Sequence, residues 1–175
     1  GVEEMKDLDA WTNYALALPG IDPEKIGMLG DSLGASMVIQ YAQDHETISA
    51  VVAHSAFSSM QDTIETSVTH YTSLPPFPFA PLIKFWAELD LGICIDTIDA
   101  KKWIPNISPR PVLLIHSLDD EVISGVSGEL LFNAAHEPKQ LWLESGVGHA
   151  DFDVAMPEQY EKRVVGFFNQ YFFDD

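Results

Sequence analysis

The chain has 175 residues and a formal net charge of −18, from 27 acidic and 9 basic side chains. This length is enough for one domain with a sizeable core, and the negative charge would repel nucleic acid and anionic membranes. No apolar run reaches the ~18 residues of a membrane span and no signal peptide is visible, so we expect a cytoplasmic protein.

The first third of the chain predicts two helices and two strands. Apolar residues recur there at three- and four-residue steps, as on one face of a helix that ends at Pro19: Met5, Leu8, Trp11, Ala15 and Leu18. A short apolar strand is predicted over 25–29, a helix over 35–42, and a buried strand over 48–53. The segment from about 57 to 106 then breaks this rhythm, with four prolines over 75–81 and several aromatic residues.

The last third predicts two further strands, over 111–116 and 140–144. Between them it predicts a helix over 125–135, with an apolar face formed by Val126, Leu130, Leu131 and Ala134. A final helix begins at Pro157 and has an apolar face formed by Tyr160, Val164, Phe167, Phe168 and Tyr171. Because strands alternate with helices, we expect an α/β fold with a mostly parallel sheet and helices on both faces.

Residues with catalytic chemistry follow three of these strands. The stretch Gly30-Asp31-Ser32-Leu33-Gly34 reads G-x-S-x-G between a strand and a helix, the setting of a nucleophile elbow, and glycine tolerates so tight a turn. Asp119 and Asp120 follow the strand over 111–116, and His149 follows the strand over 140–144. The order Ser, Asp, His is typical of α/β-hydrolases and differs from that of other serine triads.

With these motifs the sequence resembles the α/β-hydrolase superfamily, most closely the serine hydrolases of its dienelactone-hydrolase, prolyl-oligopeptidase and Bem46-like branches. The stretches 19–27, 111–116 and 148–151 carry the resemblance together with the elbow. In that pattern the acid lies four residues after the strand-ending His116, which favours Asp120, and Asp119 and Asp62 are the alternatives.

The resemblance implies a serine mechanism that needs no cofactor. Ser32 would be the nucleophile, His149 the general base and Asp120 the residue that orients it, while the backbone N–H of Leu33 would bind the oxyanion. The expected substrate is a small molecule with an ester, thioester or related acyl bond. A prolyl-oligopeptidase-type peptidase and a non-catalytic, ligand-binding relative are the alternatives.

The resemblance also implies a lid-like insertion, over about 57–106, within a single domain spanning 1–175. Four aromatic side chains there are candidates for the wall of an acyl pocket: Phe57, Phe77, Phe79 and Trp86. Cys94, the one cysteine, lies among apolar residues, and we expect a buried structural thiol. The histidines show no zinc-binding spacing, so no metal site is expected.

One departure from the family concerns the second oxyanion donor, which a loop upstream of the elbow normally provides. Only 29 residues precede Gly30, and they predict one helix and a turn. Because the first half of the usual sheet is not predicted, we expect a partial domain with an exposed sheet edge. Its expected partner is a complementary N-terminal segment or a second copy of the chain.

Overall fold

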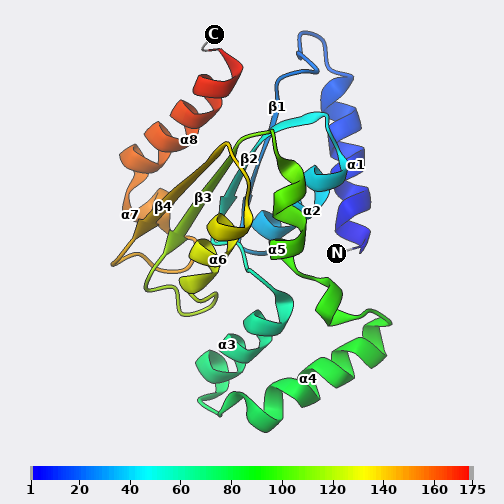
Figure 1. Ribbon diagram of the computed structural model, residues 1–175, viewed down its shortest axis with the longest axis vertical. Helices are drawn as coiled ribbons and strands as arrows, with labels where there is room; N and C mark the ends of the chain where they lie inside the picture. Colours follow the sequence, from blue (N-terminus) through cyan, green and yellow to red (C-terminus); the bar gives the residue numbers. More distant parts are fainter. Residues whose placement is uncertain (1, 174–175) are drawn as a thin grey trace.

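A computed structural model describes residues 2–173 and contains one four-stranded parallel sheet in the order β1-β2-β3-β4 (Figure 1). The strands are β1 (Ile26–Asp31), β2 (Ile48–His54), β3 (Val112–Ser117) and β4 (Lys139–Glu144). All four run in one direction, so their carboxyl ends lie at the same edge of the sheet. The predicted α/β fold with a parallel sheet is confirmed.

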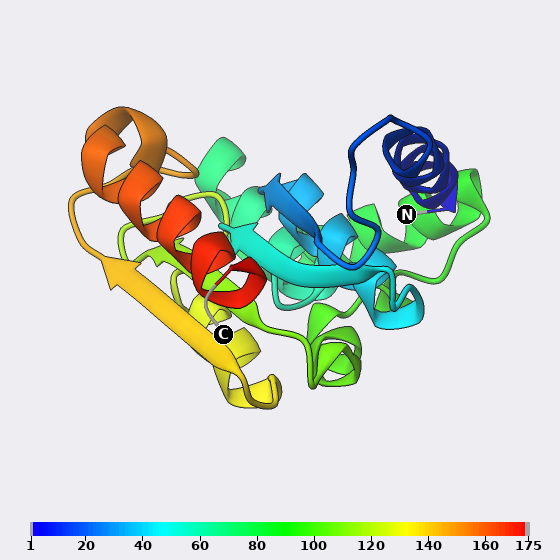
Figure 2. The same cartoon turned by 90° about the horizontal axis from the view of Figure 1, so that it is seen from above.

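The two central strands are buried, which explains why they read as continuous apolar runs. Side chains alternate along each strand, so each strand supplies two hydrophobic layers. Val51 and Leu114 face a layer completed by α2 (Leu33–Asp44), α5 (Ala100–Trp103), η2 (Ile104–Ile107) and α6 (Val126–Ala134). Val52 and Ile115 face the opposite layer, which α7 (Phe152–Ala155) and α8 (Pro157–Phe172) complete. Figure 2 shows the sheet between α8 and α6.

Two of the helical faces that the sequence predicts differ from the structure. In α1 (Val2–Leu16), Met5 and Leu8 pack against the core, but Trp11 remains 69% exposed. In α6, Leu131 is buried whereas Val126 and Leu130 are exposed. The face predicted for α8 is correct, because Tyr160, Val164, Phe167, Phe168 and Tyr171 all belong to its hydrophobic layer.

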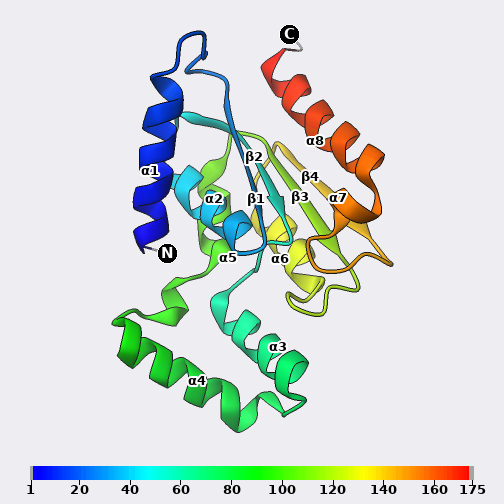
Figure 3. The ribbon, with the colours of Figure 1, turned by 180° about the vertical axis from the view of Figure 1, so that it is seen from behind.

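Between β2 and β3 the chain leaves the sheet as a helical excursion formed by α3 (Met60–Thr72) and α4 (Pro76–Leu91) (Figures 1 and 3). The short helix η1 (Ile95–Thr97) and α5 lead it back to β3. Because β2 ends at His54, the excursion starts from the carboxyl edge of the sheet. Within residues 2–173, no helix has both the length and the hydropathy that crossing a membrane requires.

Candidate active site

Ser32 lies at a strained turn between β1 and α2. Its φ of 54° and ψ of −117° are outside the regions that most residues adopt. A Cβ atom on Gly30 would lie 2.4 Å from the carbonyl oxygen of Gly34, so only glycine fits at position 30. A Cβ on Gly34 would meet no atom within 4 Å in the described structure, so the second glycine of the motif has no steric requirement here.

The structure brings Ser32, His149 and Asp120 into one hydrogen-bonded chain. The distance from Ser32 Oγ to His149 Nε2 is 2.7 Å, and the distance from His149 Nδ1 to Asp120 Oδ2 is also 2.7 Å. Because an ionised carboxylate only accepts, His149 donates from Nδ1 and accepts the Ser32 hydroxyl proton at Nε2. This is the arrangement by which a neutral imidazole can remove the proton from a serine hydroxyl.

The Asp120 carboxylate is held in a fixed position and in its ionised form. Its Oδ1 accepts hydrogen bonds from the backbone N–H groups of Val122 (2.9 Å) and Ile123 (2.8 Å). Burial raises the pKa of Asp120, but the hydrogen bonds from His149, Ile123 and Val122 outweigh it, so the pKa lies below its ordinary value. An anion in this position stabilises the imidazolium that forms when His149 takes a proton.

His116 also lies against this carboxylate, with Nε2 3.6 Å from Asp120 Oδ2. Nε2 lies 3.1 Å from the carbonyl oxygen of Ile123, to which it donates its proton. Burial lowers the pKa of His116, so the ring is neutral. His116 therefore supports the loop that carries Asp120.

The two alternative acids have other partners. Asp119 Oδ2 accepts a hydrogen bond from the backbone N–H of Gly146 at 2.6 Å, which ties together two loops at the edge of the site. Asp62 lies on α3 and accepts from the hydroxyl of Ser58 at 3.1 Å. Of the three predicted acids, Asp120 is the one that contacts His149.

Leu33 follows the nucleophile as the first residue of α2. The first N–H groups of a helix have no intrahelical acceptor, and the helix dipole favours negative charge at this end. The N–H of Leu33 therefore lies where an oxyanion donor is expected.

The candidate pocket residues are in two different environments, neither of which is a closed acyl pocket. Phe57 is 2% exposed and packs in the core with Met37 and Ile123, so its prediction as a pocket wall is wrong. The Oγ of Ser36 accepts from the backbone N–H of Phe57 at 3.0 Å and fixes this position. On α4, Phe77, Phe79 and Trp86 are 77%, 37% and 62% exposed.

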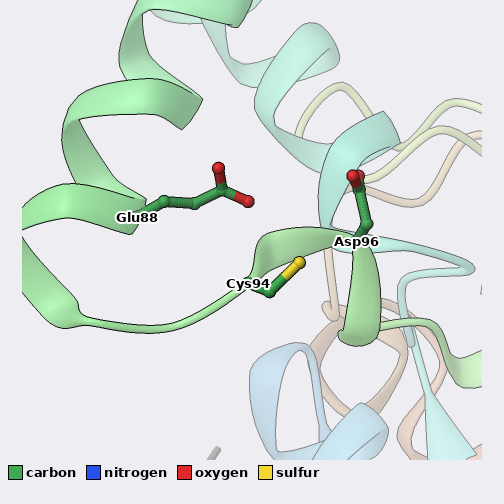
Figure 4. A group of neighbouring side chains, drawn as sticks. All are labelled: Glu88, Cys94 and Asp96. Carbon is green, nitrogen blue, oxygen red and sulfur yellow. The ribbon is translucent and has the colours of Figure 1, made fainter.

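Cys94 is exposed, so the prediction of a buried thiol is also wrong. Its apolar neighbours belong to the excursion, where Leu91 is exposed as well. The ligand atoms of Glu88, Cys94 and Asp96 lie within 4.8 Å of one another (Figure 4). Both carboxylates already have partners, since Asp96 pairs with Lys84 and Glu88 accepts from the N–H of Ile95 at 2.8 Å. These contacts account for the cluster without a metal ion.

The sequence gives no signal for two further residues at the site, His54 and Ser55. The backbone N–H of Ser32 donates to the carbonyl oxygen of His54 at 2.8 Å, and the backbone N–H of Ala150 donates to Ser55 Oγ at 3.2 Å. Both side chains are buried and lie between the loops that carry Ser32 and His149.

Comparison with known proteins agrees with this architecture. The human α/β hydrolase domain-containing protein 17B is 30% identical over 152 residues, which cover 86% of this chain and 44% of that protein. The esterase Pf2001 from Pyrococcus furiosus has a TM-score of 0.77 at 21% identity and covers 98% of this chain and 63% of its own. The acylaminoacyl peptidase from Pyrococcus horikoshii has a TM-score of 0.70 at 18% identity, with 97% of this chain and 28% of that chain covered.

This chain spans about half the length of the curated relatives it matches, between 43% and 53% of them. The solved structures establish the α/β-hydrolase fold. Residues 1–174 match the sequence profile of the prolyl oligopeptidase family, and the chain therefore belongs to that family of α/β-hydrolases.

Proposed function

We propose that this chain carries the catalytic centre of a serine hydrolase that cleaves an ester, thioester or related acyl bond. The observation that supports it best is the hydrogen-bonded chain from Ser32 through His149 to Asp120, with 2.7 Å at both steps. A serine that is only part of a turn would need neither a neutral imidazole at its hydroxyl nor a buried carboxylate behind that imidazole.

The proposed reaction has two halves. His149 Nε2 takes the proton of Ser32 as Oγ attacks the acyl carbon, and the N–H of Leu33 stabilises the oxyanion. His149 then donates that proton to the leaving group, which leaves the acyl group on Ser32. In the second half a water molecule attacks the acyl-enzyme with His149 as base, and this releases the acid and restores Ser32.

We further propose that the acyl group lies near the exposed aromatic side chains of α4. The excursion leaves the sheet at the edge where Ser32 lies, and His70 Nδ1 on α3 is 3.6 Å from Glu121 Oε2, next to Asp120. Rates for nitrophenyl esters of increasing acyl length should therefore peak at short to medium chains. The double substitution Phe77→Ala and Phe79→Ala should remove this preference, and an unchanged preference would rule the location out.

A peptidase of the prolyl-oligopeptidase type is a second candidate, because the family profile and the acylaminoacyl peptidase both point to it. The same three side chains can expel an amine, since His149 returns a proton to the leaving group. Paired substrates with one acyl group, a nitrophenyl ester and a peptide nitroanilide, would separate the two. The ester proposal predicts a higher kcat/KM for the ester and negligible anilide cleavage.

Labelling with a fluorophosphonate tests whether Ser32 is activated at all. We expect one adduct per chain, located on Ser32 and absent after Ser32→Ala. Ser73→Ala removes another serine with positive φ, far along the chain on the excursion, and should leave the labelling intact. An unlabelled parent chain would favour the non-catalytic, ligand-binding alternative.

A further inference from the structure

The end of β2 carries two buried polar side chains that the proposed reaction does not use. His54 is 1% exposed and Ser55 is fully buried. Ser55 also has a φ of 55°, which is unfavourable for a residue with a side chain. Strain of this kind persists only where the surrounding contacts impose it. The contacts of these two residues are therefore informative.

His54 holds the nucleophile turn at two points. Its carbonyl oxygen accepts the hydrogen bond from the N–H of Ser32 at 2.8 Å, and its Nδ1 lies 2.8 Å from Oδ1 of Asp31. Asp31 is the residue directly before the nucleophile. Because a carboxylate only accepts, the proton of the His54 ring is on Nδ1.

The rest of the His54 ring is enclosed by apolar side chains. Its Nε2 is buried and has no hydrogen-bond partner within the described residues. Phe152 meets the ring edge-on at 5.1 Å and Tyr160 lies at 5.3 Å. Burial lowers the pKa of His54 although Asp31 and Asp153 oppose this, so the ring is neutral and suited to donate to Asp31.

Ser55 holds the loop of the general base. Its Oγ accepts from the N–H of Ala150 at 3.2 Å, and its own N–H donates to the carbonyl oxygen of Ile115 on β3 at 2.8 Å. Ala150 directly follows His149 and also has a positive φ, 54°. Ser32, Ser55 and Ala150 are thus three strained residues joined by hydrogen bonds through β2.

We infer that His54 and Ser55 are positioning residues, which fix the separation between the nucleophile turn and the loop that carries His149. His54 sets the place of Ser32, Ser55 sets the place of Ala150, and the two residues are adjacent at the carboxyl end of β2. The 2.7 Å contact between Ser32 Oγ and His149 Nε2 depends on both connections. This inference rests on the proposed function, because it concerns the activation of Ser32.

The Ser55 connection is tested by two substitutions with opposite effects on strain. Ser55→Ala removes the hydroxyl and keeps the unfavourable φ, whereas Ser55→Gly removes the hydroxyl and relieves the strain. If the hydrogen bond positions the loop, both variants label with a fluorophosphonate about 10-fold to 100-fold more slowly than the parent, the range that a small misplacement causes. Ser73→Gly is the matched control, because Ser73 has a φ of 57° at the end of α3.

The His54 connection is tested by substituting its exposed partner Asp31, because a truncation of His54 itself would create a cavity in the core. Asp31→Ala leaves the Nδ1 proton of His54 without an acceptor, whereas Asp31→Asn keeps an acceptor oxygen at the same place. Labelling of the alanine variant should be slowed and that of the asparagine variant should recover most of the parent rate. A purely structural role predicts slowing in proportion to the loss of thermal stability, which is measured on the same samples.

Parental labelling rates for Ser55→Gly, or equal rates for the two Asp31 variants, would overturn the inference. If Ser55→Ala does not fold, Ser55→Gly still decides, because it relieves strain. A parent chain that is not labelled at Ser32 would instead contradict the proposed function. The two failures can be told apart, because labelling of the parent tests the proposed function and the rates of the variants relative to the parent test the inference.

Discussion

At the scale of single residues, the site depends on one buried carboxylate and on the strain at one serine. One oxygen of Asp120 accepts hydrogen bonds from two backbone N–H groups and the other accepts from His149, so the imidazole has a preferred orientation and tautomer. Ser32 is held with φ at 54° by its bond to β2 and by the close approach of Gly30 to Gly34. Each feature can be tested by a substitution, with a substitution at a nearby residue as its control.

Asp120→Asn should lower kcat for ester hydrolysis by about 10³-fold to 10⁴-fold, because an amide neither selects the reactive tautomer of His149 nor stabilises its charged form. Asp119→Asn is the control, because that side chain contacts Gly146 and not the imidazole. It should retain most of the activity. Equal losses in the two variants would refute the assignment of the acid.

Gly30→Ala should destabilise the fold by about 1–3 kcal/mol and abolish labelling of Ser32, because the new methyl group meets the Gly34 backbone at 2.4 Å. Gly34→Ala meets no atom within 4 Å and should be tolerated, since alanine also favours the helix that begins there. Urea unfolding of both variants gives the two free energies. A stable, labelled Gly30→Ala variant would show that the turn can relax.

The three catalytic candidates could be predicted from the sequence because each directly follows a strand whose apolar run is readable. The roles of His54 and Ser55 could not be predicted, because neither the positive φ of Ser55 nor a hydrogen bond between distant segments produces a pattern in the local sequence. The choice of Phe57 as a pocket residue failed for a related reason. In an irregular segment, the local sequence around an aromatic residue does not indicate whether its side chain faces the core or solvent.

At the scale of elements, β2 and β3 both carry a buried histidine near the carboxyl edge. Burial lowers the pKa of His54 and of His116 below 6.5.

The predicted strand over 25–29 extends to Asp31 in the structure, because Gly30 and Asp31 still pair with β2. Glycine and aspartate disfavour strands, so this extension depends on pairing that the local sequence does not show.

The free energy of unfolding should fall as the pH drops through 6.5. Above that pH both rings are neutral in the folded and unfolded chain, whereas below it only the unfolded chain readily takes up the protons. The lowered pKa of Asp120 adds a second loss of stability below pH 3.8. Urea unfolding from about pH 7.5 to about pH 5 measures the first effect.

His116→Gln should flatten this dependence on pH, because glutamine can still donate to Ile123 and does not titrate. His136→Gln is the control, because His136 is exposed and its substitution should leave the slope unchanged. If the slope is the same in the parent and in His116→Gln, the buried histidine at the end of β3 does not contribute to acid sensitivity.

At the scale of the whole molecule, β1 is one of the two outer strands of the sheet within residues 2–173, and its outer edge is unpaired. There β1 pairs with β2 alone, and Leu29 and Leu33 beside it are 40% and 49% exposed. These two residues line a hollow of about 310 Å³ together with Gly30, Gly34 and Met37, and Asp7 and Leu8 of α1 line it as well. Unpaired strand edges and exposed apolar side chains favour association. We propose that a complementary N-terminal segment or a second copy pairs here.

The chain by itself should therefore associate. Its monomer should turn over esters poorly even with the triad assembled, because no strand precedes β1 within residues 2–173 to carry the loop that provides the second oxyanion donor in α/β-hydrolases. Losing one such donor costs about 10²-fold to 10³-fold in kcat. Sedimentation and an ester assay on the same sample test both statements. A well-behaved monomer with robust, Ser32-dependent turnover would contradict them.

The proposed function requires that Ser32 becomes acylated, and the mass of the intact chain measures this step. The chain is mixed with excess nitrophenyl ester and quenched in acid within one turnover. Its mass is then measured by mass spectrometry in parallel with that of the Ser32→Ala variant. We predict a mass increase of one acyl group, located on the peptide that contains Ser32, and no increase in the variant. An unchanged mass in the parent despite ester hydrolysis, or the same adduct in Ser32→Ala, would contradict it.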